Sequence, residues 1–93
     1  MTNELKRYEE ALAAFEQAIR LDPNFAPAYS GKGVALENLQ HFEEALAALE
    51  QAIHLNPNYA GAYHSKGVAL ERLGRKAEAQ KAFQRARDLD YGD

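Results

Sequence analysis

The stretch YEEALAAFEQAIRLDPNFAPAYSGKGVALENLQH, residues 8–41, decides the fold because a similar stretch follows it directly in the chain. Shifted by 34 residues, it lies over FEEALAALEQAIHLNPNYAGAYHSKGVALERLGR, residues 42–75, and 23 of the 34 positions are identical. A weaker third copy, KAEAQKAFQRARDLDYGD, closes the chain. A fixed period of this length is typical of stacked repeat proteins, in which each unit buries its apolar face against the next unit.

Each period contains two helical patterns. Within residues 42–55, apolar residues recur three and four positions apart while glutamates take the other face, as in an amphipathic helix. Pro57 stops this pattern, and Pro27 suits the first turn of a helix, where a backbone N–H has no partner. The connections are too short for anything except antiparallel neighbours. We therefore expect an all-α solenoid of five helices, at about 5–21, 27–39, 42–55, 61–73 and 76–89.

Certain residue types hold fixed places in the period: an aromatic residue, glycine and leucine on the first helix, then alanine, a large apolar residue and a following proline. They are Tyr29, Gly33, Leu36, Ala45, Leu49 and Pro57 in one copy, Tyr63, Gly67, Leu70, Ala79 and Phe83 in the next, and Ala11, Phe15 and Pro23 in the first. This pattern resembles the tetratricopeptide repeat. The resemblance implies a right-handed superhelical solenoid built of antiparallel helix hairpins.

On that resemblance, the single domain divides into a half repeat (1–25, second helix only), a complete repeat (26–59) and a second repeat with an atypical end (60–93). Tyr91 stands where the family has proline, and Lys32 and Lys66 stand where it has leucine. We expect both lysines to lay their methylene stems along a neighbouring repeat with the ammonium group in water.

Composition excludes several functions. The net charge of −3 argues against a nucleic-acid partner, and the absence of cysteine excludes disulfides and thiolate metal sites. No apolar run approaches the length of a membrane span, so we expect no membrane partner and, by default, a cytoplasmic protein. The histidines at 41, 54 and 64 are scattered, so we expect neither a metal nor any other cofactor.

The stretch Ser30-Gly31-Lys32-Gly33 looks at first like the end of a phosphate-binding loop, which would indicate a small nucleotide-binding protein. Such a loop needs a strand before it, whereas these residues lie inside a helical pattern. One period later the first glycine is replaced by Ser65. We therefore interpret Gly33 and Gly67 as points of close helix approach, opposite Ala45 and Ala79, and leave Gly31 without a packing role.

In the family that the chain resembles, ligands bind the concave face lined by the first helix of each repeat. The resemblance implies a groove lined by Ser30, Gly31, Val34, Glu37, Asn38, His64, Ser65, Val68, Glu71 and Arg72. A subset of the family grips carboxylate tails with basic residues at these places, but here they are small, apolar or acidic, with Arg72 alone at the edge. We expect a protein–protein interaction scaffold that takes an extended peptide or partner helix, and no enzyme activity.

The ends of the array suggest self-association. Residues 8–21 lack the first helix of their own hairpin, and no solvating helix follows the last one, so we expect apolar faces at both ends. Gln40 stands where the family often has glycine, so residues 39–41 could continue as helix and exchange hairpins between copies. The expected contacts are Ala11, Phe15, Ala18, Gln40, Ala79, Phe83 and Ala86. The alternatives are a purely structural self-assembling unit and a fragment of a longer array.

Overall fold

The computed structural model describes residues 2–91. In that range the chain forms five α-helices and no strand: α1 (Thr2–Leu21), α2 (Ala26–Asn38), α3 (Phe42–Leu55), α4 (Ala60–Arg72) and α5 (Lys76–Tyr91). The expected all-α solenoid of helix hairpins is confirmed. Residues 1 and 92–93, the outermost residues of the expected half repeat and last repeat, lie outside the described range.

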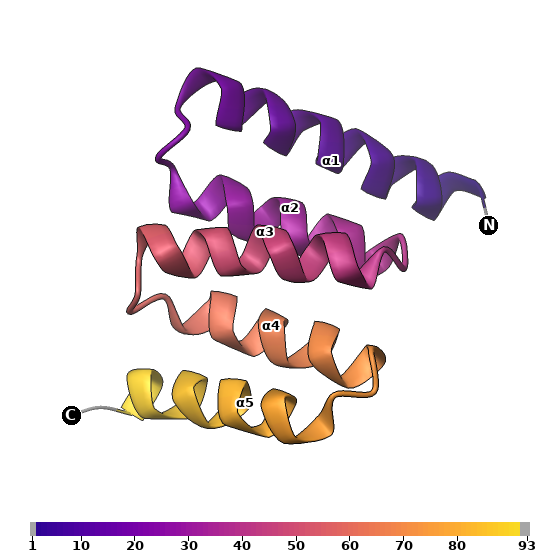
Figure 1. The fold of residues 1–93 in the computed structure, drawn as a ribbon. Helices are drawn as coiled ribbons and strands as arrows, with labels where there is room; N and C mark the ends of the chain where they lie inside the picture. The colour runs from indigo at the N-terminus through magenta and orange to yellow at the C-terminus, as the bar shows by residue number, and fades with distance from the viewer. Residues whose placement is uncertain (1, 92–93) are drawn as a thin grey trace.

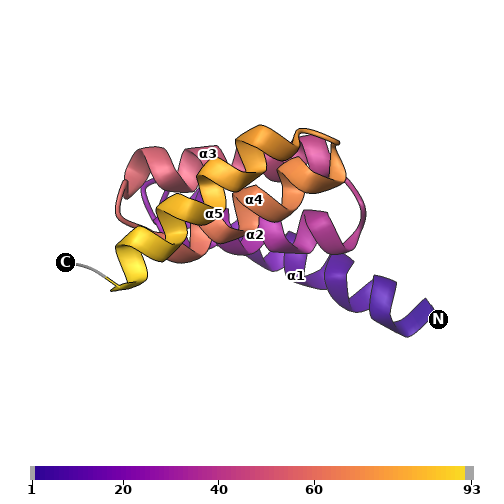
Figure 2. The same ribbon diagram turned by 90° about the horizontal axis from the view of Figure 1, so that it is seen from below.

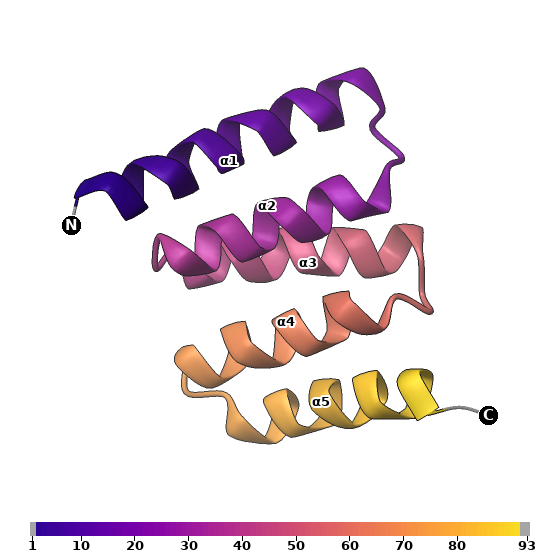
Figure 3. The same cartoon turned by 180° about the vertical axis from the view of Figure 1, so that it is seen from behind.

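The helices stack in chain order and alternate in direction, with α1 and α5 at the two ends (Figure 1). The α3 ribbon lies in front of α2 in Figure 1 and behind it in the view from the back (Figure 3), so these two helices belong to different layers. Seen from below, α5 crosses the helices behind it obliquely (Figure 2). Within the described range α1 contacts only α2 and α5 only α4, whereas α2 contacts α1, α3 and α4.

The connections between repeats begin with an Asx turn. A side-chain oxygen of Asp22 accepts the backbone N–H of Asn24 at 3.1 Å, and Asn56 accepts that of Asn58 at 3.2 Å. The proline between these residues cannot continue a helix, so α1 ends at Leu21 and α3 at Leu55. Because α5 has no such proline, it runs two residues further than we expected.

The turns inside the two hairpins are alike. Gly74, between α4 and α5, has φ of 80°, and Gln40, between α2 and α3, has φ of 64°. In a single copy of the chain residues 39–41 do not continue as helix: Gln40 adopts the left-handed conformation and closes the hairpin. The N–H of His41 donates to the carbonyl of Leu36 at 2.8 Å, a bond that seals the end of α2.

The core lies between the helices of each hairpin and between neighbouring repeats. Leu49 and Leu70 are its largest fully buried side chains. A Cβ on Gly33 would lie 2.5 Å from Cγ of Leu49, and one on Gly67 would lie 2.6 Å from Cε1 of Phe83. The close approach at both glycines is confirmed, but they face Leu49 and Phe83 rather than the alanines that we expected.

Candidate functional site

The structure brings the two predicted groove helices, α2 and α4, into contact. On α2, Val34 is 39% exposed, although it is one of the large apolar residues, and its counterpart Val68 on α4 is half-buried. Glu71 and Arg72 are exposed, and so is Asn38, which donates a hydrogen bond to the carbonyl of Val34 at 3.1 Å.

Two predicted groove residues on α2 are covered, Ser30 almost wholly and Gly31 in part. Ser30 is only 8% exposed, and Gly31 lies against Phe15 of α1. A Cβ on Gly31 would come within 2.3 Å of the Phe15 ring. Gly31 therefore has the packing role that sequence reasoning did not assign to it, and it contributes no open space to the groove.

Glu37 lies half-buried near the C-terminal end of α2. Its Oε2 atom is buried and has no hydrogen-bond partner in the described part of the chain. Burial raises the pKa of Glu37 to about 7, and the positive charge of Arg72 on α4 partly opposes this shift. The Arg72 guanidinium also lies 5.8 Å from the centre of the Phe42 ring. This arginine therefore makes a cation–π contact with the preceding repeat.

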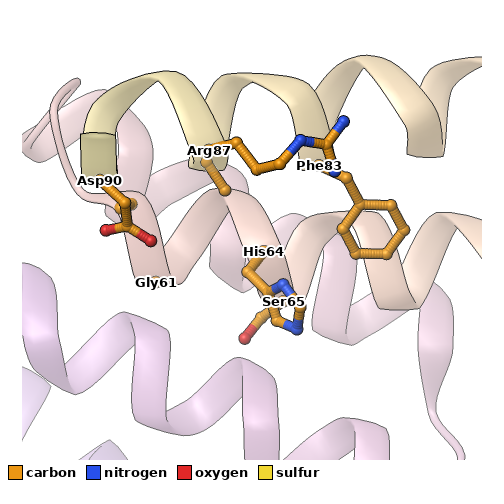
Figure 4. Close-up of a pocket in the computed structure, with 8 residues that line it drawn as sticks. Gly61, His64, Ser65, Phe83, Arg87 and Asp90 are labelled. Atoms are coloured by element: carbon orange, nitrogen blue, oxygen red, sulfur yellow. The ribbon is translucent and has the colours of Figure 1, made fainter. Parts of the chain in front are cut away.

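A groove of about 600 Å³ lies between α4 and α5 (Figure 4). It unites two residues of the predicted concave groove, His64 and Ser65, with two residues predicted for self-association, Phe83 and Ala86. The His64 and Phe83 rings are tilted by 57° with their centres 5.3 Å apart. The other lining residues are Ala60, Gly61, Arg87 and Asp90.

Sequence reasoning missed these last four lining residues. The 34-residue shift could have revealed two of them, because it places the charged residues Arg87 and Asp90 where the preceding repeat has the uncharged Ile53 and Asn56. One period earlier, helix α4 packs against both α2 and α3, and Ser30, the counterpart of His64, is buried. Among the described helices none packs on α5 besides α4, and the polar lining residues His64, Arg87 and Asp90 are exposed.

The predicted apolar patch at the C-terminal end is wrong for two of its three residues. Ala79 is 0% and Ala86 5% exposed, because both are buried between α4 and α5, and Phe83 is half-buried. Most of the outward positions of α5 carry polar side chains, so this helix solvates its own end of the stack. These positions include Lys76, Gln80, Lys81, Gln84, Arg85, Arg87 and Asp88.

The N-terminal end differs. Ala11, Phe15 and Ala18 of α1 are half-buried, whereas their counterparts in α3, at positions 45, 49 and 52, are all 0% exposed. Helix α3 lies between α2 and α4, but α1 contacts α2 alone within the described range. Part of the apolar face of α1 is therefore open, as expected.

The structure excludes a phosphate loop at residues 30–33, because all four residues lie inside α2.

The Lys32 ammonium lies 3.6 Å from a carboxylate oxygen of Glu16, and Lys66 lies 3.6 Å from Glu50 one period later. Both lysines thus reach back to the preceding repeat, where the ammonium group lies beside a glutamate. In the described part of the chain no three potential ligand side chains converge as a metal ion would require. Within that same part, no helix combines the length and apolar character needed to cross a membrane.

Comparison with known proteins agrees with this geometry. A family profile described as "Tetratricopeptide repeat" matches residues 3–65 and 38–93. Among solved structures, the TPR2B domain of yeast Sti1, in a complex with pHsp70, is 32% identical, with a TM-score of 0.88. That match covers 91% of this chain and 68% of the other.

Two further structures are similar. The first TPR domain of Spaghetti (RPAP3), bound to the HSP90 peptide SRMEEVD, has a TM-score of 0.90 at 26% identity, over 97% of this chain and 71% of the other. MamA has a TM-score of 0.85 at 29% identity, over 97% of this chain and 53% of its own, so the chain spans about half the length of MamA. No curated protein sequence matched the chain.

Proposed function

The chain belongs to the tetratricopeptide repeat family, and on that premise we propose that it binds an extended peptide or a partner helix along α2 and α4. The observation that carries the proposal is the exposure of Val34, at 39%, on a helix in contact with α4, which bears Val68 at the equivalent position. Apolar side chains flanked by polar ones are the usual lining of a peptide groove. The Sti1 and RPAP3 domains, with peptide partners of their own, support this assignment.

The groove chemistry favours a ligand unlike the acidic peptide of RPAP3. Glu37 and Glu71 line the surface, and the basic side chain beside them, Arg72, already interacts with Phe42. Repulsion between the exposed Glu71 carboxylate and an acidic peptide opposes binding, and Glu37, whose pKa is about 7, adds fully to this repulsion only above neutral pH. We therefore expect SRMEEVD to bind weakly and peptides with apolar side chains and little negative charge to bind better.

A peptide array probed with the whole chain tests the proposal. Peptides that bind are measured again by fluorescence anisotropy with the variant Val34→Glu plus Val68→Glu, which should weaken binding at least about tenfold because it buries charge against an apolar ligand. The matched control is Ala13→Glu plus Ala77→Glu, two exposed positions on α1 and α5. The proposal fails if no bound peptide depends on the two valines while circular dichroism shows intact helices.

A second candidate function is self-association, which the open apolar face of α1 favours. Stacking of end on end is less favoured, because the outer face of α5 is polar and its alanines are buried. Exchange of helices between two copies remains as the other route. A purely structural self-assembling unit would share this behaviour but would show no valine-dependent peptide binding.

A further inference from the structure

The turn between α2 and α3 contains Gln40, which among residues 2–91 is the one residue other than glycine with a positive φ. We infer that this turn is a strained hinge, and that two copies of the chain open it and exchange α1–α2 against α3–α5 to form a domain-swapped dimer. This inference rests on the proposed self-association and names its route.

The strain is evident from the second hairpin, whose turn is built in the same way. The N–H of residue 40 donates to the carbonyl of Glu37 at 2.9 Å, and the N–H of Gly74 donates to that of Glu71 at 3.0 Å. The next backbone hydrogen bond, from the N–H of His41 to the carbonyl of Leu36, is 2.8 Å long. Its counterpart, from Arg75 to Leu70, is 2.9 Å long. The two turns therefore differ chiefly in the Cβ of Gln40, which clashes with its own backbone in the left-handed conformation, whereas glycine has no Cβ.

The open form has a precedent within the chain. Residues 5–8 occupy the same place in the period as residues 39–42, and they run as continuous helix within α1. Residues 39–41 contain neither proline nor glycine, so nothing in them prevents a helix. An open chain would form one helix from Ala26 to Leu55, about 45 Å long at 1.5 Å per residue.

Exchange preserves the packing. Helix α1 contacts only α2 in the described range and travels with it, while the contacts of α2 with α3 and α4 re-form between copies. The cluster of Leu36, Ala45 and Ala48 spans the hinge and is restored in the same way. Exchange thus costs the hydrogen bonds of the turn and the translational freedom of the two copies, and it releases the strain at two copies of Gln40.

The test is to unfold the chain in urea, refold it at high concentration, and measure mass by light scattering before and after dilution. A swapped dimer should persist for a long time after dilution, because separation requires α2 to leave its core, whereas a dimer held by surface contact dissociates at once. Gln40→Gly should lower the dimer association constant about 30-fold or more, since two left-handed sites are relieved in the monomers. Gln40→Ala, a better helix former, should raise it.

Gln80→Gly on α5 is the matched control, because it makes the same chemical change in an exposed helical position away from the hinge. It should leave the dimer fraction unchanged. A wild-type chain that stays monomeric after this treatment overturns both the exchange and self-association. A dimer that separates at once on dilution, or that Gln40→Gly does not weaken, overturns the exchange alone and leaves peptide binding untouched.

Discussion

Phe15 of α1 packs directly on the backbone of Gly31 in α2, so closely that a Cβ on the glycine would lie 2.3 Å from the ring tip. One period later the same two places hold Leu49 and Ser65. In the first junction the large ring of Phe15 goes with a glycine, which has no side chain. In the second, the smaller Leu49 goes with a serine. The contact of Phe15 with Gly31 thus belongs to a junction in which both residues differ from their counterparts one period later.

The first prediction concerns this pairing. Gly31→Ser should destabilise the fold by about 1–3 kcal/mol through overpacking against Phe15, and Phe15→Leu in the same chain should recover much of that loss. A double-mutant cycle from urea unfolding should give a coupling of about 1 kcal/mol, as for residues in contact. Additive effects of the two changes would mean that the ring simply moves aside.

The glycines themselves are not equivalent. Gly33→Ala should cost about 2 kcal/mol or more, because the new methyl group meets the fully buried Leu49 at 2.5 Å. Gly61→Ala serves as the matched change, since its Cβ meets only Tyr59 at an ordinary 3.5 Å. There the better helix propensity of alanine should leave stability unchanged or raise it by up to about 1 kcal/mol. Thermal and urea unfolding measure both changes, and equal effects would refute the packing role of Gly33.

A pH dependence follows from Glu37. Because burial raises its pKa from 4.5 to about 7, the folded chain binds this proton more tightly than the unfolded chain. Its contribution to stability is present below about pH 4.5 and is lost as the pH rises through about 7. Glu37→Gln should therefore match the wild type near pH 4 and exceed it by about 1 kcal/mol near pH 8, a figure reduced for solvent screening.

Melting temperatures measured across that pH range provide the check. Glu71→Gln changes the equivalent, exposed residue of the next repeat and should leave the pH dependence as in the wild type. Parallel curves for the wild type and Glu37→Gln would show that the buried oxygen has no energetic effect.

The lysine contacts between repeats should be weak. Lys66 and Glu50 are 3.6 Å apart with side chains 27% and 54% exposed, so their coupling should be about 0.2–1 kcal/mol and should shrink in high salt. The cycle of Lys66→Gln and Glu50→Gln measures it, with Lys32 and Glu16 as an independent copy at the same distance. A coupling that salt does not reduce would show that the lysine stem, rather than the charge, provides the contact.

The repeated sequence was enough to predict the five helices and their hairpin order. Apolar residues three and four positions apart mark the helices, and prolines at 23 and 57 mark two ends, because both signals act over a few neighbouring residues. No proline follows α5, and there the predicted end of the helix, residue 89, was two residues too early.

The groove could be predicted only in part. The period predicts one face for Val34 and Val68, since they are equivalent residues of stacked repeats, and the structure leaves Val34 exposed and Val68 half-buried. It could not reveal that Ser30 is buried, or that His64 and Ser65 line a groove with Arg87 and Asp90. The burial of these residues depends on whether another helix packs beside them.

By itself, then, the sequence determined the elements, their stacking and the family, because these follow from short-range patterns repeated every 34 residues. Only the tertiary structure decided what each small or polar residue does. Gly31 proved to be a packing residue because a ring 16 positions earlier in the chain lies over it. Gln40 proved to close a hairpin because the packing of α2 against α3 and α4 outweighs the local cost of its left-handed conformation.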